Sequence, residues 1–216
     1  MITAVIHVRG ISHSDLVHPS KSSASLTAGL LVPLVLLLVP LIVLLDIALT
    51  SALEALFPVS AWEQRAFADM AAATLPAFIS TCLIAPAEEE MLFRGILLRS
   101  FLARYPRGVA IGYSALYFGA THMNIYQFLL AFLLGLLLGW PYERSRSLSP
   151  CIALHAVVNG VVVMWGASTG PAATPTLTAV PAVGWLAAVA AATLGTVVLR
   201  RLLCPKQREI GQRCDP

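Results

Sequence analysis

The stretch from residue 26 to residue 50 reads LTAGLLVPLVLLLVPLIVLLDIALT, and it decides the fold class. Most of it is Leu, Val and Ile. A helix that crosses a bilayer needs about 20 mostly apolar residues, so this run is long enough to span one. Pro33, Pro40 and Asp46 lie within it, and a membrane helix can tolerate such residues. The run is too long for a cleaved signal peptide and lacks a convincing cleavage site, so we expect it to remain as a membrane anchor.

The whole chain shares this composition. Its 216 residues are 58% hydrophobic and 12% charged, with a mean hydropathy of +0.81. Soluble domains carry about 25% charged residues, so half that fraction favours lipid as the solvent. The net charge is only +3 and the basic residues do not cluster with aromatic ones, so nucleic-acid binding has no support. The four cysteines fit neither a metal-binding spacing nor a disulfide framework.

The apolar segments predict an all-α, polytopic transmembrane helical bundle with about six spans. After the first run, a second span begins at about Phe67, reaches Pro86 and continues as a helix to about Arg104. The remaining spans cover residues 107–123, 125–142, 148–167 and about 179–199. Gly135 and Gly139 lie four residues apart in the fourth span, which favours close helix packing. We expect a cytoplasmic segment at 1–25, a membrane domain at 26–204 and a basic cytoplasmic tail at 205–216.

The basic residues predict the orientation of these spans. Six spans with a cytoplasmic N-terminus put twelve of the 14 Lys and Arg in the cytoplasm, leaving Arg65 outside and Arg94 within the membrane. Basic residues on every second loop follow the positive-inside pattern. The sequence therefore predicts that both termini are cytoplasmic. The twelve residues are Arg9, Lys21, Arg99, Arg104, Arg107, Arg144, Arg146, Arg200, Arg201, Lys206, Arg208 and Arg213.

Three adjacent acids, Glu88-Glu89-Glu90, interrupt the apolar segments. Ionisable groups at membrane depth cost about 2.5–3.5 kcal/mol each on insertion scales, so they are functional candidates. Glu90 and Arg94 are spaced i, i+4 and can form an ion pair, which would leave Glu89 available for chemistry. The alternative is that the acids lie at the water interface and begin a helix after Pro86, a reading that suits Glu88 best.

Three further polar residues are expected at the depth of Glu89. Glu89 lies 16 residues before Tyr105 and His122 lies 16 residues after Pro106, so the two arms of a hairpin bring them to the same level. His155 and Asn159 are spaced i, i+4 in the fifth span and face the same way. The helical rise of about 1.5 Å per residue puts them at a similar depth. Alone, they could bond across helices for packing.

These residues resemble the motifs of one family. Glu89-Glu90-Met-Leu-Phe-Arg94 is similar to the EExxxR motif of the CAAX-protease and bacteriocin-processing (CPBP, or Abi) family. Phe118-x-x-x-His122 and His155-x-x-x-Asn159 resemble its second and third motifs, in the same order, within about residues 80–165. The resemblance implies an intramembrane endopeptidase whose site forms between buried helices. It says little about the first 60 residues or the sixth span.

The mechanism we expect is hydrolysis of a peptide bond by an activated water. Glu89 with His122 would orient and deprotonate the water. His155 and Asn159 would donate hydrogen bonds to the oxyanion, a role worth about 3–4 kcal/mol for one well-placed donor. Glu90 and Arg94 would support the helix and the field around Glu89. We expect no cofactor, and no Ser or Cys nucleophile is apparent, since no other motif supports Cys151 in that role.

Other interpretations remain open. Zinc could be held by Glu89, His122 and His155, because two His and a Glu fill three positions of a catalytic site. However, the sequence lacks an HExxH helix. The chain could also be a non-enzymatic membrane immunity or regulatory protein, or a small transporter with an intramembrane proton relay. The transporter is less attractive because no internal repeat is detectable.

The expected partners are membrane lipid and a protein or peptide substrate, without nucleic acid. The resemblance allows a prenylated C-terminus, a bacteriocin leader or a C-terminal sorting signal as the substrate. The short chain and simple topology suggest a bacterial inner (cell) membrane. The sequence does not indicate an oligomeric state or a cleavage position.

Overall fold

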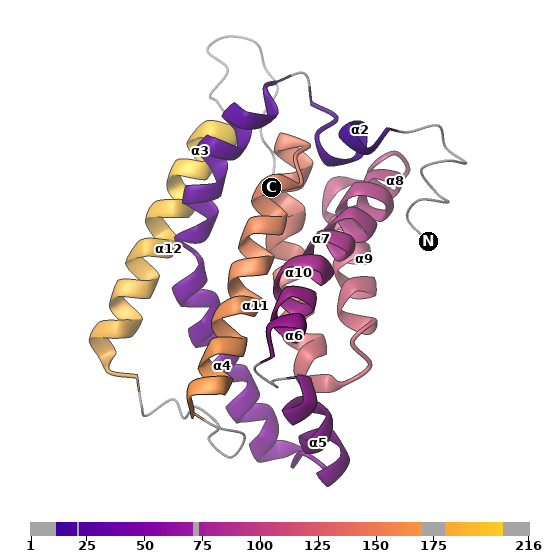
Figure 1. Cartoon of the computed structure of the whole chain (residues 1–216). Coiled ribbons are helices and arrows are strands. Elements are labelled where there is room, and N and C mark those ends of the chain that lie inside the picture. The colour runs from indigo at the N-terminus through magenta and orange to yellow at the C-terminus, as the bar shows by residue number, and fades with distance from the viewer. Residues whose placement is uncertain (1–11, 21, 71–73, 170–179, 205–216) are drawn as a thin grey trace.

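The computed structural model describes residues 12–20, 22–70, 74–169 and 180–204, and it shows helices joined by short connections (Figure 1). Within these ranges there is no β-strand, which confirms the all-α prediction. Four helices in the described part are long and apolar enough to cross a bilayer. They are α4 (Val39–Leu56), α10 (Ile125–Ser145), α11 (Ser149–Thr169) and α12 (Ala182–Leu203). The count of six spans stays a prediction.

The apolar run at 26–50 forms two helices instead of the one that we predicted. The first is α3 (Ala24–Leu36), capped by the Ser23 side chain, and α4 follows after Leu37 and Leu38. Pro40 lies in the first turn of α4. Because proline has no N–H to donate to the carbonyl four residues earlier, it interrupts a helix interior but suits a helix start. Hydropathy predicted the apolar run correctly and missed the break.

The predicted second span begins later than expected. Phe67 belongs to α5 (Ala61–Met70), a separate helix of low hydrophobicity. The next helix begins at Leu75, where the Thr74 side chain caps it, and runs without a break to Leu102. Its successive parts are α6 (Leu75–Ile79), η1 (Ser80–Ile84), α7 (Ala85–Glu90), η2 (Met91–Leu98) and α8 (Arg99–Leu102). We call residues 75–102 the composite helix.

Two parts of the composite helix, η1 and η2, have π-helical hydrogen bonding. Pro86 lies two residues after the end of η1, and in a regular α-helix its ring would clash with the carbonyl of Cys82. A π-helical turn shifts the hydrogen bonds by one residue and relieves this conflict without ending the helix. The backbone remains helical at Ile84, Ala85, Glu90 and Met91, so the motif residues sit on one uninterrupted element.

The predicted hairpin turn at Tyr105-Pro106 is present, and α9 (Arg107–Ala120) follows it. This helix packs closely along α10. A Cβ added at Gly135 would lie 2.8 Å from the Ala115 Cα, and one added at Gly139 would lie 2.7 Å from the Ile111 Cγ2. The two glycines therefore allow the close approach that their spacing predicted.

Part of the N-terminal segment also packs on the bundle. The short helix α2 (His13–Val17) buries Leu16 against Gly95 of η2. The Leu148 N–H donates to the Val17 carbonyl at 2.9 Å, which ties α2 to the turn between α10 and α11. The α2 segment and this turn therefore lie at the same end of the bundle as the end of the composite helix. The basic tail at 205–216 lies outside the described residues.

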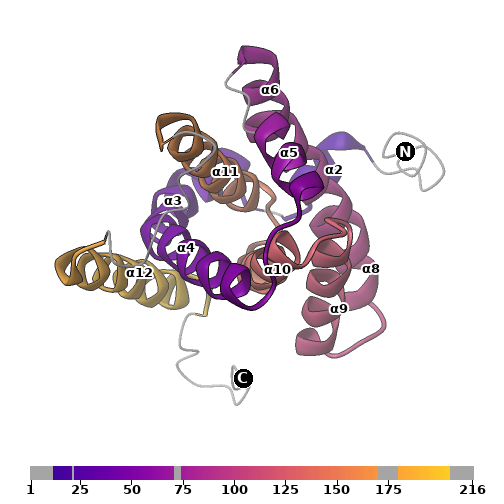
Figure 2. The ribbon, with the colours of Figure 1, turned by 90° about the horizontal axis from the view of Figure 1, so that it is seen from below.

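Viewed along the bundle, the helices form two groups with α10 and α11 between them (Figure 2). One group holds α3, α4 and α12, and the other holds the composite helix and α9. The main core joins both groups through fully buried apolar side chains on the composite helix, α10 and α11, including Leu98, Leu138 and Leu154. This packing brings α11 against α7 and η1, and so aligns the motifs.

Candidate active site

A buried ion pair on the composite helix forms the base of the candidate site. The Arg94 Nη1 donates to the Glu90 Oε1 at 2.7 Å, one helical turn away. Both side chains are buried, with relative exposures of 1% and 0%. The ion pair predicted from the i, i+4 spacing is confirmed. A buried charge without a partner has a high desolvation cost. Each of these two residues therefore offsets the cost of burying the other.

His155 on α11 extends this pair across the bundle. Its Nδ1 lies 2.9 Å from the same Glu90 Oε1, and its Nε2 lies 3.7 Å from the Glu89 Oε2. Since Glu90 is paired with Arg94, its carboxylate accepts from Nδ1–H. The His155 ring is therefore fixed by one glutamate and faces the other. Glu90 thus accepts from both Arg94 and His155.

The three adjacent glutamates occupy different environments. Glu90 is fully buried, Glu89 keeps 35% of its side chain exposed, and Glu88 is exposed. The Glu89 Oε2 lies 3.7 Å from the His155 Nε2, and His122, Glu90 and Arg94 lie near enough to act on this carboxylate electrostatically. Of the three glutamates, Glu89 is therefore the one that is partly exposed to solvent and also close to the histidines of the site.

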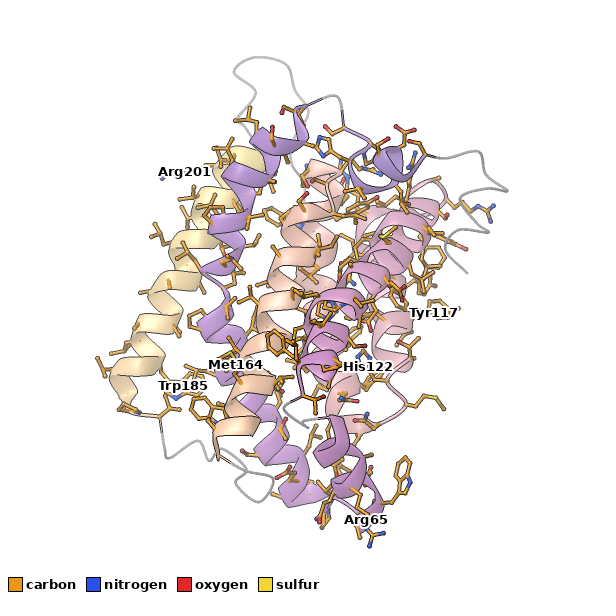
Figure 3. All side chains as sticks on the ribbon, viewed as in Figure 1. Arg65, Tyr117, His122, Met164, Trp185 and Arg201 are labelled. Carbon is orange, nitrogen blue, oxygen red and sulfur yellow. The ribbon has the colours of Figure 1, made fainter. Side chains whose placement is uncertain are left out.

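His122 lies just beyond the end of α9, toward the lower end of the bundle (Figure 3). Its Nδ1 lies 3.1 Å from the Phe118 carbonyl oxygen. A carbonyl can only accept, so this nitrogen carries the proton. In the neutral ring the Nε2 lone pair can then accept a proton.

Asn159 reaches a different part of the composite helix. Its Nδ2 donates to the Thr81 carbonyl at 3.0 Å, in the π-helical segment η1, eight residues before Glu89. This bond uses one of the two N–H donors of the amide. The residue lies one turn along α11 from His155, as its spacing predicted, and the other N–H is not engaged by a described residue.

One aromatic ring contacts three of these groups. The guanidinium of Arg94 lies 4.5 Å from the Phe118 ring centroid. The rings of His122 and His155 lie 5.4 Å and 5.5 Å from it, both nearly perpendicular. Phe118 is 1% exposed. It comes from α9, so α9, α11 and the composite helix all meet at this ring.

The structure thus brings together Glu89, Glu90, Arg94, His122 and His155, and it holds Asn159 one turn away. Three features escaped the sequence reasoning. These are the contact of His155 with Glu90, the bond of Asn159 to a carbonyl of η1, and the position of the Phe118 ring. The place of Phe118 four residues before His122 was the one available signal, because this spacing puts both on one helical face.

The zinc alternative requires a cluster of metal-ligating side chains. Within the described ranges, which include Glu89, His122 and His155, no three His, Cys, Asp or Glu side chains converge as metal ligands would. The Nδ1 atoms of both histidines are engaged by the protein itself, so Nε2 is the nitrogen through which each ring would act. We derive no step through a metal ion.

Comparison with known families agrees with the motifs. Residues 71–161 match the family model described as type II CAAX prenyl endopeptidase Rce1-like. The matched stretch contains every candidate site residue, from Glu89 to Asn159, and confirms the resemblance to the CPBP family. Searches of the curated proteins and of the solved structures found no significant match.

Proposed function

Residues 71–161 match the type II CAAX prenyl endopeptidase Rce1-like family, and from this match we propose that the chain is an intramembrane endopeptidase. It would hydrolyse a peptide bond of a membrane-associated protein or peptide with an activated water. One observation carries the proposal. The partly exposed Glu89 carboxylate lies 3.7 Å from the His155 Nε2, and the His155 and His122 rings both contact Phe118, so the acid and the two histidines of the three motifs gather at one place.

The activation of water is assigned to Glu89 and His122. The Phe118 carbonyl holds the proton of His122 on Nδ1, so the neutral ring offers Nε2 as a proton acceptor. Glu89 offers a second acceptor nearby. A water between the two would be oriented by both and would lose its proton as it attacks the carbonyl carbon. The proton would then pass to the leaving amine.

The stabilisation of the oxyanion is assigned to His155 and Asn159. Because His155 donates through Nδ1 to Glu90, it can donate to substrate through Nε2 only when the ring carries both protons. The Glu90 and Glu89 carboxylates lie 2.9 Å and 3.7 Å from its two ring nitrogens. Asn159 would add the N–H that is not used on Thr81. Donors aimed at the developing charge lower the barrier most.

Glu90 and Arg94 would act as supports and not as reacting groups. Glu90 accepts from both Arg94 and His155, so it fixes the His155 ring while Arg94 balances its charge. Both are buried, which removes them from contact with substrate. The orientation of the His155 ring on α11 would therefore depend on the Glu90–Arg94 ion pair of the composite helix.

The test compares the termini of membrane proteins in cells that carry the wild type, Glu89→Ala or Glu88→Ala. Glu88 is the exposed neighbour on the same helix, so its variant is a matched control. We expect one or more new termini to disappear in Glu89→Ala and to persist in Glu88→Ala. Identical termini in wild type and Glu89→Ala would refute the protease and favour an immunity or regulatory protein.

The metal question needs its own measurement. Activity of the purified protein would be followed with and without a chelator, together with its zinc content. The glutamate mechanism predicts full activity after chelation and zinc well below one per chain. Stoichiometric zinc that is lost together with activity would favour the zinc-dependent alternative.

The family and the apolar helices make this an integral membrane protein. We propose the bacterial inner membrane as its location, with both ends of the chain in the cytoplasm. The substrate would approach from lipid or from the membrane surface, since the groups of the site lie on helices of a membrane domain. Membrane lipid and a protein or peptide substrate are the proposed partners.

A further inference from the structure

We propose that Phe118 is a positioning residue of this site, whose ring holds Arg94, His122 and His155 in their working arrangement. The inference rests on the proposed function for its catalytic meaning. Its structural part concerns one aromatic ring that contacts a member of each of the three motifs. Phe118 touches no reacting atom and would act through the groups that it holds.

The first observation is the contact with Arg94. The guanidinium lies over the face of the ring, 4.5 Å from its centroid, where the negative charge of the π-system attracts a cation. Within the described residues, Arg94 makes one side-chain hydrogen bond, to Glu90, and its Nη2 has no hydrogen-bond partner. The ring is therefore the second protein group that holds this buried charge.

The second observation is the contact with both histidines. The rings of His122 and His155 meet Phe118 at interplanar angles of 84° and 78°, an arrangement that aromatic quadrupoles favour. His155 lies on α11 and His122 lies just after α9, and the structure shows no hydrogen bond between their side chains. The ring between them fixes their relative position. The Phe118 carbonyl also holds the His122 Nδ1, so one residue acts on His122 through both ring and backbone.

The third observation is that Phe118 itself is firmly held. It is 1% exposed and packs against the Phe93 ring at 5.1 Å. The next residue, Gly119, lies so close to α10 that an added Cβ would come within 2.9 Å of the Phe128 carbonyl oxygen. A ring packed in this way can serve as a fixed platform, because a close-packed interior leaves a buried side chain little room to move.

The chain offers a matched pair of substitutions. Phe118→Leu removes the aromatic faces and leaves an apolar side chain, whereas Phe93→Leu makes the same change in the neighbouring buried ring. The Phe93 ring contacts Phe118 and neither histidine. Both changes leave a cavity and should lower stability comparably. Only Phe118→Leu removes the contacts to Arg94, His122 and His155.

The direct test uses the full chain in detergent micelles, labelled with nitrogen-15 in histidine. The signals of His122 and His155 would be assigned from His122→Gln and His155→Gln variants. We expect Phe118→Leu to shift both signals and to weaken the Nδ1–H form of His122, while Phe93→Leu leaves them near the wild type. Unchanged signals in Phe118→Leu, or equal shifts in both variants, would overturn the proposal.

A conservative variant guards against loss of folding. Phe118→Tyr keeps the ring faces and should keep the two histidine signals near those of the wild type. If Phe118→Leu does not fold, Phe118→Met, whose side chain fills more of the space, takes its place in the comparison. A Tyr variant that folds but has the histidine signals of the Leu or Met variant would contradict a role for the aromatic ring.

Activity supplies the second readout, with a fluorescence-quenched farnesylated peptide ending in a CAAX sequence as the probe. Misplacement of catalytic groups by about 1 Å can cost about a hundredfold in rate, so we expect kcat of Phe118→Leu to fall by about that factor with KM nearly unchanged. An equal loss in Phe93→Leu would refute the specific role. If the wild type cleaves neither this probe nor any membrane-protein terminus, the proposed function fails, and the histidine signals still decide the position of Phe118.

Discussion

At the scale of the residue, neighbouring glutamates differ because a helix turns by about 100° from one residue to the next. Glu90 faces the interior and meets Arg94 and His155, whereas Glu89 keeps a third of its side chain exposed. The same side chain at adjacent positions is therefore a support in one case and a candidate reacting group in the other. Their substitutions should separate stability from activity.

The substitution Glu90→Gln should destabilise the protein strongly. It leaves the buried Arg94 charge without its partner, and breaking a buried pair in this way costs about 3–5 kcal/mol in the free energy of unfolding. Activity should fall as well, because His155 loses the carboxylate that fixes its ring. Thermal unfolding in detergent, measured beside cleavage of a reporter peptide, checks both effects.

Glu89→Gln is the control for this prediction. Its side chain is partly exposed and makes no hydrogen bond that the structure shows, so the unfolding temperature should stay near that of the wild type while activity is lost. A Glu90→Gln variant as stable as Glu89→Gln would show that the ion pair contributes little.

Some of these residue contacts could be predicted from the sequence. The Glu90–Arg94 pair follows from the spacing of the two residues within one helix. Residue spacing and helical rise also predicted that Glu89, His122 and His155 lie at a similar depth. The contact of His155 with Glu90, in preference to Glu89, could not be predicted in this way. It depends on how α11 is rotated against α7, and that rotation is set by packing across the whole bundle.

At the scale of the element, the pair α9 and α10 depends on small residues at its contact. The substitution Gly135→Ala would bring a Cβ to 2.8 Å from the Ala115 backbone, which cannot move aside as a flexible side chain can. We expect a loss of about 1–3 kcal/mol in the free energy of unfolding, typical of overpacked interiors. Since α9 carries Phe118 and leads to His122, activity should fall too.

Gly112→Ala on α9 is the matched control. A Cβ there meets nothing within 4 Å, so alanine should stabilise the helix by about 0.5–1 kcal/mol through its better helix propensity. Unfolding of the two variants under identical detergent conditions gives the comparison. Equal stability of Gly135→Ala and Gly112→Ala would contradict the close contact between the helices.

A second element-scale prediction concerns the start of α5, outside the spans. The Glu63 carboxylate accepts from the Ser60 hydroxyl at 2.7 Å and from the Ser60 N–H at 2.9 Å, while Ser60 accepts from the Glu63 N–H. These bonds lower the pKa of Glu63 below its ordinary value of 4.5. The capping arrangement therefore stabilises α5 fully above that value and is lost as the pH falls through the lowered pKa.

Hydrogen exchange measures this effect directly. After correction for the pH dependence of intrinsic exchange, protection of the first-turn amides of α5 should decrease on acidification in the wild type. In Glu63→Gln the acid-dependent part of the decrease should disappear. A wild-type protection that does not change between neutral and acidic pH would refute the capping role of the ionised carboxylate.

The observed helix boundaries show which features of the fold could be predicted from hydropathy and which could not. Hydropathy identified α10, α11 and α12 within a few residues, because each is one long apolar helix. It missed the break before Pro40 and the π-helical turns around Pro86, since both are responses of backbone hydrogen bonding to proline. It also could not show that α9, at 14 residues, is shorter than the other long helices.

At the scale of the whole molecule, the ends of the bundle carry different charges. Arg201 lies at the upper end and Arg65 at the lower end in Figure 3. The upper end also holds the Arg107–Glu143 ion pair at 3.2 Å and the bond from Arg99 to the Asp15 carbonyl. Basic residues therefore gather at the end where α2 packs, and the positive-inside pattern predicts that this end faces the cytoplasm.

This asymmetry predicts which end faces the cytoplasm, and labelling of single cysteines in intact cells tests it. In a cysteine-free background, Ala103→Cys marks the basic end and Gln64→Cys marks α5, and both positions are exposed without bearing a charge. A membrane-impermeant maleimide should label Gln64→Cys in intact cells and Ala103→Cys only after permeabilisation. The reverse pattern would invert the topology. Labelling of both positions from one side would mean that the helices between them cross the bilayer an even number of times or not at all, and the arrangement of spans would then need revision.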